Sequence, residues 1–463
     1  MTSVSQQLAD VLAATRFEDL PPTAVNDTRR SILDWLGSAL AGALEPPARM
    51  MREVVGSFGA SQESTVFAGG RASAPAAALA NGVASHILEL DDIHKGSTVH
   101  AAAPVIPAAL AVAERERASG RDFLLAVTVG YEAALRVGEA VNPSHYRFWH
   151  PTGTAATFGA AAAAGSILGL DARQMLDALG SAGTQAAGLW EFNADGAMSK
   201  HLHPGKAALN GVLSADLARV GFTGASKILE GDRGFFRAMS TSHDESKITA
   251  GLGRDWKVSE NCYKVWACCG HTHSAIDVAG ELRSQRGGLR ADDVASIRIE
   301  TYGPGYEIVK AMNPGTTYEA KFSIAYCVAA ALLHGGAPLD VFSSDHFANA
   351  GVSDSEIATL LKRTTVSVAP DLTANYPRAW PTRLSVTLTD GTVLRGASDF
   401  PVGNPENPVS TTQLEEKFTG LVAPRWGDDS AARAIEILHA LESVDDMSKA
   451  FAAFTHEPAV ALR

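Results

Sequence analysis

Four short segments of the chain bring together side chains that can carry protons or bind anions. The first segment spans residues 89–100, and an apolar run at 101–110 follows it. Three acids, two histidines and a lysine within twelve residues are dense for a solvated loop, and a buried wall beside them would shift their pKa values. Helix capping and surface charge are the alternative interpretation. The candidates are Glu89, Asp91, Asp92, His94, Lys95 and His100.

The second segment, residues 147–154, places His150 directly before Pro151 and the expected start of an alanine-rich helix. The backbone N–H groups at a helix start bind anions, and a histidine at this place can face such an anion. The alternative is an imidazole that only satisfies the helix cap.

The third segment contains Lys200, His201, His203 and Lys206, directly before a helix expected at 206–220. The positive end of that helix dipole would add to their charge. In a chain of net charge −12, such a local basic cluster predicts an anion site. An exposed basic turn is the alternative.

The fourth segment is Cys268-Cys269-Gly-His271-Thr-His273, with Asp277 four residues further on. Two histidines near two cysteines suggest a zinc site. The spacing, however, matches no closed Cys/His ligand set. We therefore favour a catalytic or substrate-facing His273, with His271 as a further imidazole beside it, and we predict no metal site.

Composition excludes several classes of protein. The 463 residues include 39 Lys and Arg against 51 Asp and Glu, whereas a general nucleic-acid binder carries a basic surplus. Four cysteines without a CxxC pair predict reduced thiols. The N-terminus lacks the pattern of a secretory signal, and the apolar stretch at 155–170 is mostly alanine and glycine. We expect a soluble cytoplasmic protein that binds neither nucleic acid nor a membrane.

Several signatures of cofactor and hydrolase chemistry are missing from the sequence. There is no GxGxxG after a strand, no GxxxxGK[ST], no HExxH and no GxSxG. The sequence therefore argues against a nucleotide cofactor, zinc-protease chemistry and serine hydrolysis. Histidine, lysine and carboxylate chemistry without a cofactor remains.

Hydrophobic periodicity predicts helices through most of the first 260 residues. After a helix that begins near residue 24, the expected helices cover 75–87, 103–118, 123–140, 153–168, 172–187 and 206–220. Many of these stretches are rich in alanine and glycine, which let helices approach closely. A compact helical bundle is expected here.

After about residue 262 the pattern changes to alternation. Strands are predicted at 294–302, 364–368, 383–389 and 392–396, with a helix at 321–334. Asp390-Gly391 is a strong hairpin signal. Helices return at 412–418 and 430–441. The predicted fold is mainly α with an α+β insertion: residues 1–262 and 403–463 form a large helical domain, and residues 263–402 form a smaller α+β domain.

Taken together, these segments resemble the MmgE/PrpD family, which includes 2-methylcitrate dehydratases, cis-aconitate decarboxylases and iminodisuccinate epimerases. The resemblance covers nearly the whole chain in the right order. The segments that carry it are LELDDIHKGSTVH (88–100), HPTGTAATFGAAAAAG (150–165), MSKHLHPGKAALNG (198–211), ACCGHTHSAID (267–277) and AKFSIAY (320–326).

The resemblance implies a helical domain and a smaller α+β lid with the site between them, a homodimer, and no required metal or nucleotide cofactor. It places site histidines at His100, His150 and His273, the site lysine at Lys200, and a lid tyrosine at Tyr326. The acidic stretch of the family falls on 89–92. One position departs, because Ile93 stands where the decarboxylases and methylcitrate dehydratases have a threonine.

These features predict a cofactor-independent lyase, in the first place a dehydratase of a small anionic hydroxy-carboxylic acid. An epimerase, a decarboxylase and a non-catalytic carboxylate-binding protein are the alternatives. Lys200, with Lys206 or Lys95, would bind carboxylates, and the site histidines would exchange protons. The predicted catalytic residues are His100, His150, Lys200, His273, Tyr326 and Asp92. The predicted substrate-binding residues are Glu89, Asp91, His94, Lys95, His203, Lys206 and His271.

Overall fold

The computed structural model describes residues 2–348 and 351–458, and these separate into two compact units. Among the described residues, the first unit contains the chain up to Ile87, Asp91–Cys262 and the chain from Ser410 onward. The second unit contains Leu88–Leu90 and Tyr263–Val409. The predicted class, mainly helical with a small mixed sheet, is confirmed.

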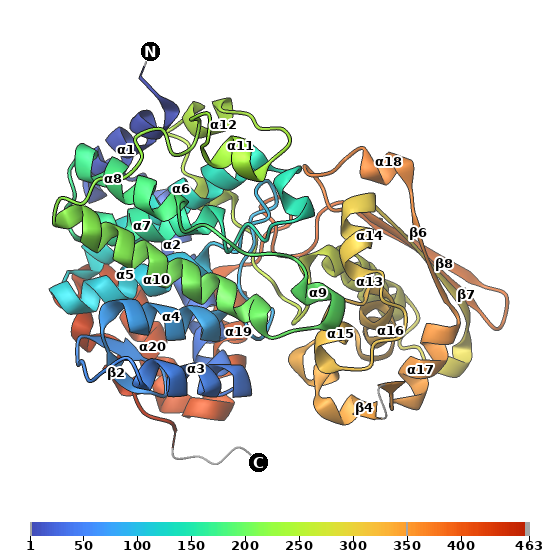
Figure 1. Ribbon diagram of the computed structural model, residues 1–463. Coiled ribbons are helices and arrows are strands. Elements are labelled where there is room, and N and C mark those ends of the chain that lie inside the picture. The colour runs from blue at the N-terminus through green and yellow to red at the C-terminus, as the bar shows by residue number, and fades with distance from the viewer. Residues whose placement is uncertain (1, 349–350, 459–463) are drawn as a thin grey trace. The chain divides into compact units, whose positions relative to one another are not determined.

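The first unit is a bundle of helices (Figure 1). The helices that bound the site are α4 (Ala74–Ser85), α5 (Ala102–Glu116), α6 (Gly120–Val141), α7 (Ala155–Ile167) and α10 (Ser199–Arg219). The others are α1 (Val4–Ala14), α2 (Pro22–Gly42), α3 (Pro46–Gly56), α8 (Ala172–Gly183), α9 (Phe192–Asp195), α11 (Phe235–Met239), α12 (Ser246–Thr249), α19 (Thr411–Trp426) and α20 (Asp428–His439). A short hairpin joins β1 (Ser64–Val66) and β2 (Gly70–Ala72).

Small residues set the spacing of the central helices. A Cβ atom at Gly82 of α4 would lie 2.7 Å from the Cα of Gly205 in α10, and one at Gly159 of α7 would lie 2.5 Å from the carbonyl oxygen of Gly130 in α6. The backbones therefore touch where these glycines meet, since real Cβ contacts are never that short. This close packing fixes the helix ends from which the candidate residues project.

The last helices return to the first unit. Lys417 Nζ of α19 lies 2.5 Å from Asp34 Oδ1 of α2, and Trp426 Nε1 donates a hydrogen bond to Leu40 O. The chain thus leaves the helical bundle for the second unit and comes back to pack against α2. Within the described residues, no helix combines the length and the hydropathy that a bilayer span requires.

The second unit holds a four-stranded sheet in the order β6-β3-β7-β8. Strand β3 (Val294–Thr301) pairs parallel with β6 (Thr364–Val368) and antiparallel with β7 (Thr382–Leu388), which forms a hairpin with β8 (Val393–Ser398). All four strands were predicted. The helices and remaining strands are α13 (His273–Gln285), α14 (Gly303–Val309), α15 (Thr317–Lys321), α16 (Ile324–His334), β4 (Phe347–Ala348), β5 (Gly351–Val352), α17 (Ser355–Lys362) and α18 (Pro370–Thr373).

One boundary matters for the site. Helix α10 begins at Ser199, seven residues before the predicted start, so the basic segment 200–206 forms its first two turns and not a turn before it. Pro204 and Gly205 weaken helix propensity, which is why the helix was predicted to begin only at residue 206. The packing of Gly205 against α4 overrides that local preference. Helices α3 and α13 and the β1–β2 hairpin were also not predicted.

The α4–α10 contact predicts a stability effect at Gly205. In Gly205→Ala the new Cβ atom would lie 2.5 Å from Leu79 O and 2.6 Å from Val83 Cγ2, so we expect a loss of roughly 1–3 kcal/mol of unfolding free energy. Urea denaturation followed by circular dichroism measures it. The control is Gly420→Ala in α19, where nothing lies within 4 Å and the substitution should stabilise by about 0.5–1 kcal/mol. Equal stability of both variants would contradict this packing.

Candidate functional site

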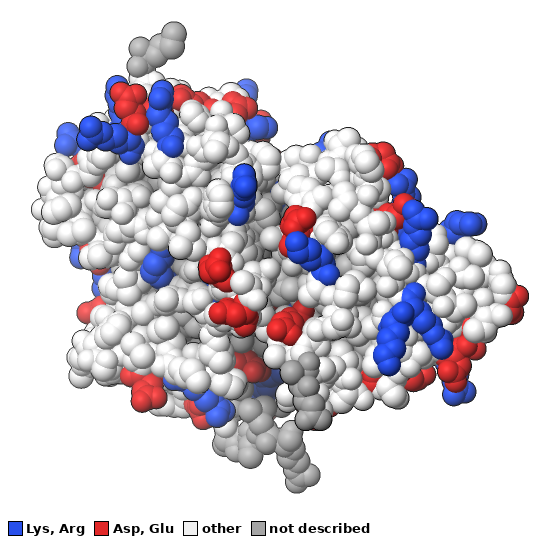
Figure 2. Space-filling view, turned by 45° about the vertical axis from the view of Figure 1, so that its right-hand side comes forward, with Lys and Arg blue, Asp and Glu red and all other residues white. Residues whose placement is uncertain are grey.

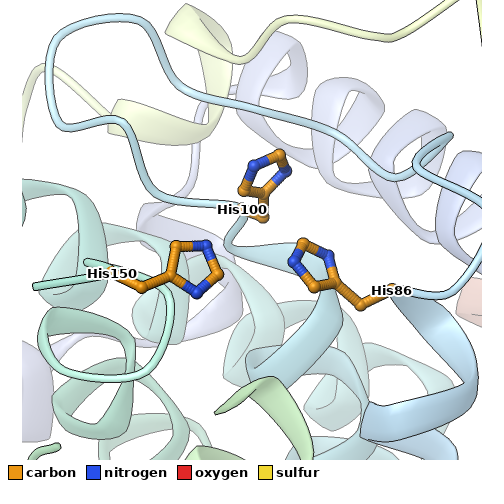
Figure 3. A group of neighbouring side chains, drawn as sticks. All are labelled: His86, His100 and His150. Atoms are coloured by element: carbon orange, nitrogen blue, oxygen red, sulfur yellow. The ribbon is translucent and has the colours of Figure 1, made fainter. Parts of the chain in front are cut away.

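Three buried imidazoles, His86, His100 and His150, meet in the first unit; we call them the histidine group. His86 caps the C-terminus of α4, His100 lies two residues before α5, and His150 lies in the loop before α7. One ring nitrogen from each lies within 4.8 Å of those of the other two. In Figure 3 the rings of His86 and His150 point toward each other, and His100 lies above them in this view. Three separate helices therefore position one cluster.

Asp92 holds His100 in place. The backbone carbonyl of Asp92 lies 2.6 Å from His100 Nδ1, which fixes that ring. Its carboxylate accepts hydrogen bonds from the first N–H of α5 at Ala102 (3.1 Å), from Tyr131 Oη (2.6 Å) and from Asn261 Nδ2 (2.8 Å). Burial raises the pKa of Asp92 to about 7, and the hydrogen bond from Tyr131 opposes that rise. Because both carboxylate oxygens accept hydrogen bonds from the protein, Asp92 is held in place, and its backbone carbonyl orients His100.

The adjacent acid, Asp91, binds a different histidine. Asp91 Oδ2 lies 2.6 Å from His86 Nδ1 and 3.4 Å from His100 Nδ1, and all three side chains are buried. Glu89, two residues earlier, belongs to the second unit, where Lys264 Nζ lies 3.4 Å from its carboxylate. The predicted acidic cluster is thus divided among separate partners.

His150 pairs with His203 of α10. Their Nδ1 atoms are 3.0 Å apart, so one ring donates to the lone pair of the other. Burial lowers the pKa of His150 well below its usual value, and His203, His86 and Lys200 lower it further. Burial, with Lys206, lowers the pKa of His203 to about 3. Both imidazoles are therefore neutral at pH 7, and His150 Nε2 is buried without a hydrogen-bond partner among the described residues.

Lys200 adds a positive charge close to these neutral rings. It lies in the first turn of α10, is 2% exposed, and depresses the pKa values of both His150 and His203. The outer surface is different, since acidic and basic side chains are interspersed on the face shown in Figure 2 and the net charge is −12. The interior of the first unit therefore offers a local cationic environment that suits an anion.

Two aromatic rings lie beside His150. Trp190 and Phe192 lie 5.0 Å and 5.9 Å from the ring of His150, measured between centroids. Trp190 Nε1 donates to the carbonyl of Trp149, which fixes its indole. These rings give His150 an apolar surrounding that strengthens its interactions with charge.

Lys206 links two segments of the first unit through hydrogen bonds. Its Nζ donates to the carbonyl oxygens of Ala187 (2.7 Å), Gly153 (3.2 Å) and Gln185 (3.4 Å), and burial lowers its pKa to about 8. The ammonium thus joins the loop that carries His150 to the chain after α8. His201, also predicted within this segment, has its ring 6.5 Å from that of His86.

His94 and Lys95 lie away from these contacts. His94 Nδ1 is 2.9 Å from Ser97 Oγ, and its Nε2 is 3.4 Å from Glu260 and 3.9 Å from Glu139. Lys95 next to it is half-buried. His94 therefore belongs to a second polar group, which it forms with Glu139 and Glu260.

The remaining predicted residues lie in the second unit. His271 Nδ1 is 2.5 Å from Tyr302 Oη, and burial lowers the pKa of His271 to about 3. His273 Nε2 is 3.4 Å from Cys268 O. Tyr326 Oη donates to Val341 O at 2.6 Å, and burial raises the pKa of Tyr326. The hydroxyl of Tyr326 is therefore engaged by its own unit.

In the part of the chain that the structure describes, two sets of side chains have donor atoms close enough for a metal ion. In the histidine group the donors suit zinc, but the charge of Lys200 nearby disfavours a cation and favours an anion. In the second set, His94, Glu139 and Glu260, the ammonium of Lys257 lies 3.0 Å and 2.9 Å from the two carboxylates. Both sets are therefore better explained without a metal.

The sequence analysis missed His86, Tyr131 and Asn261. A single histidine at the end of an alanine-rich helix is typical of a core residue, and only its spacing of five residues from Asp91 could have indicated a link. Tyr131 and Asn261 contact Asp92 from 39 and 169 residues away, a separation at which the sequence carries no signal.

The electrostatics predict the protonation of His150. At pH 6, His150 and His203 should remain neutral, because burial and nearby charges lower their pKa values. Lys200→Gln removes one of those charges and should raise both pKa values. Long-range ¹⁵N–¹H NMR of histidine-labelled protein measures this. The exposed control Lys449→Gln should change neither, and a His150 pKa unaltered by Lys200→Gln would refute the contact.

Comparison with known proteins agrees with this architecture. Residues 6–247 match the MmgE/PrpD N-terminal domain and residues 266–443 match the MmgE/PrpD C-terminal domain. The chain is 28% identical to cis-aconitate decarboxylase of Homo sapiens, covering 97% of this chain and 94% of that protein. It is 28% identical to cis-aconitate decarboxylase of Aspergillus terreus (96% and 95%) and 26% identical to the cis-aconitate decarboxylase-like protein oryM of Aspergillus oryzae (98% of each). The chain belongs to the MmgE/PrpD family.

Proposed function

We propose that this chain is a cofactor-independent lyase that dehydrates a small hydroxy-polycarboxylic acid. The observation that supports it most is the histidine group with Lys200 beside it. Buried neutral imidazoles can accept protons, and a buried ammonium can bind the carboxylates of the substrate. No nucleotide or metal is required for this step.

The reaction joins a proton transfer to the loss of water. A neutral imidazole removes the proton on the carbon next to a carboxylate, and the electron pair of the C–H bond remains on that carbon. This pair then forms the C=C bond as the C–O bond on the neighbouring carbon breaks. The departing hydroxyl takes a proton from an acid and leaves as water. The carbanion-like intermediate carries extra negative charge, which Lys200 would stabilise.

Roles follow from the surroundings of each residue. His150 suits a hydrogen bond to the substrate, since its Nε2 has no hydrogen-bond partner among the described residues. His100 is the candidate acid, because the Asp91 carboxylate 3.4 Å away stabilises its protonated form. His273 and Tyr326 of the second unit stay predictions from the family resemblance.

Decarboxylation is the second candidate, because the relatives that align over almost the full chain bear that name. The same residues would serve it. The C–C bond to a carboxylate breaks, carbon dioxide leaves, and the electron pair stays on carbon until an imidazolium protonates it. Ile93 is buried and apolar, so it provides no side-chain hydrogen bond to such a substrate.

Proton NMR in deuterated buffer tests the reaction. The purified chain is incubated with citrate, 2-methylcitrate, cis-aconitate and iminodisuccinate in turn, and we expect loss of water from a hydroxy acid. Loss of carbon dioxide would select the second candidate. Deuterium incorporation with inversion and no such loss would indicate an epimerase. Binding without any turnover would overturn the proposal.

The site assignment is tested on the same substrate. His150→Ala and Lys200→Ala should each lower turnover by about a hundredfold or more, because each removes a proton-transfer or charge-stabilising group. His439→Ala, which changes an exposed histidine of α20, is the matched control and should keep wild-type turnover. Near wild-type rates in both site variants would refute the assignment.

We also propose that the chain forms a homodimer through the outer face of α10. Met198, Leu202, Leu213 and Val220 are 40% to 78% exposed. Their spacings of 4, 11 and 7 residues place them on one side of the helix. These exposed apolar side chains, which we call the apolar stripe, fit a second copy of the chain.

The double variant Leu202→Glu/Leu213→Glu should separate the dimer into monomers, because it places charges in the apolar stripe. Size-exclusion chromatography with light scattering should give twice 48.5 kDa for the wild type and 48.5 kDa for the variant. Val393→Glu, at an exposed position of β8, should leave the wild-type mass unchanged. A monomeric wild type, or a dimeric double variant, would rule this interface out.

A further inference from the structure

His86 is the member of the histidine group that is paired with a carboxylate. Its Nδ1 lies 2.6 Å from Asp91 Oδ2, and both side chains have no exposed surface. A carboxylate can only accept, so Nδ1 carries the hydrogen of this bond. The tautomer is thereby fixed, and in the neutral ring the lone pair is on Nε2.

The second ring nitrogen of His86, Nε2, makes no hydrogen bond among the described residues. This atom is also buried. Buried polar atoms normally find partners, because an unpaired one has lost its hydrogen bonds to water without replacement. An unpaired nitrogen in a group of imidazoles is the arrangement expected where a ligand supplies the missing partner.

The surroundings of His86 place it in the same reaction space as the other two histidines. Its ring is stacked on that of His150, with centroids 5.5 Å apart and planes at 25°, and it meets His100 edge-on at 4.8 Å. In Figure 3 one of the two ring nitrogens of His86 lies on the side that faces His150. A substrate held by His150 would therefore also reach His86.

We propose that His86 is an acid–base residue of this site, with Nε2 as the atom that exchanges a proton with the substrate and Asp91 as its positioning residue. This inference rests on the proposed function. The C–H bond next to the substrate carboxylate breaks, its electron pair stays on carbon, and the proton binds Nε2. The carboxylate of Asp91 balances the charge of the imidazolium, as orienting carboxylates do in other acid–base pairs.

The hydrogen bond between His86 and Asp91 also suggests different roles for His86 and His150. His150 lies beside Lys200 and His203, both of which oppose a positive charge on its ring. His86 has a carboxylate at hydrogen-bond distance instead. The Asp91 carboxylate can balance the charge that a proton from the substrate brings to the ring of His86, so His86 acts as the base and His150 holds the substrate through hydrogen bonds at Nε2.

The decisive variant is His86→Asn. The amide nitrogen of asparagine can replace Nδ1 and still donate to Asp91, whereas nothing replaces Nε2. We expect a melting temperature close to wild type, KM within about threefold, and kcat lower by roughly a hundredfold or more. His439→Asn is the control for an exposed histidine. A kcat within threefold of wild type would overturn the proposal.

Asp91→Asn tests the positioning role. It should lower kcat and leave KM nearly unchanged, because the substrate still binds but the ring of His86 is no longer fixed or balanced in charge. Added imidazole should restore part of the activity of His86→Ala and none of that of Asp91→Asn. A rise in KM alone would instead indicate that Asp91 binds substrate.

A failure of the proposed function can be told from a failure of this inference. If the wild type acts on no tested acid, the proposed function fails, and tricarballylate then serves as an unreactive probe. In ¹⁵N-histidine NMR, tricarballylate should shift the Nε2 signal of His86 in the wild type. A shift confined to His150, or no shift at all, would overturn the role of His86.

Discussion

The buried carboxylate of Asp92 is the interaction on which the arrangement of the first unit depends. It accepts the first N–H of α5, the hydroxyl of Tyr131 in α6 and the amide of Asn261, while its own backbone carbonyl binds the ring of His100. Asn261 in turn contacts Ser31 of α2. Removing this carboxylate would leave several buried donors unpaired, each at a cost of about 1–3 kcal/mol. Helices α5 and α6, Asn261 and the ring of His100 are thus all bound by one residue, Asp92.

The histidines around Asp92 have two kinds of electrostatic environment. The rings of His150 and His203 are kept neutral by burial and by Lys200 and Lys206, whereas His86 and His100 have Asp91 within 3.4 Å. The first pair thus lies beside ammonium groups, whereas the second pair lies beside a carboxylate. Chemistry that needs both a proton acceptor and a proton donor can therefore use one residue type. The acidic exterior and the cationic interior are compatible because the lysine involved is buried.

The sequence predicted the regular elements well and the contacts of single residues less well. The strand at 364–368 matches β6, and the Asp390-Gly391 hairpin is present, because alternation and turn residues act locally. The start of α10 was misplaced because Pro204 and Gly205 oppose a helix that packing against α4 stabilises. At the candidate site, His100, His150 and Lys200 could be named from local motifs. Their meeting with His86, and the anchoring by Tyr131 and Asn261, result from tertiary contacts that no short pattern contains.

The segment from His86 to Ala102 requires a fixed number of residues between its contacting positions. Within it, positions 86, 91, 92, 100 and 102 are joined by contacts between side chains and backbone, so that each must fall at a set distance along the chain. Inserting or deleting one residue between Asp92 and His100 would separate the imidazole from its carbonyl and the helix start from its carboxylate. Changing the side chain of Ile93, in contrast, leaves all of these contacts in place. Variation in this stretch is therefore restricted in length, because each contact requires a fixed number of residues between its two partners.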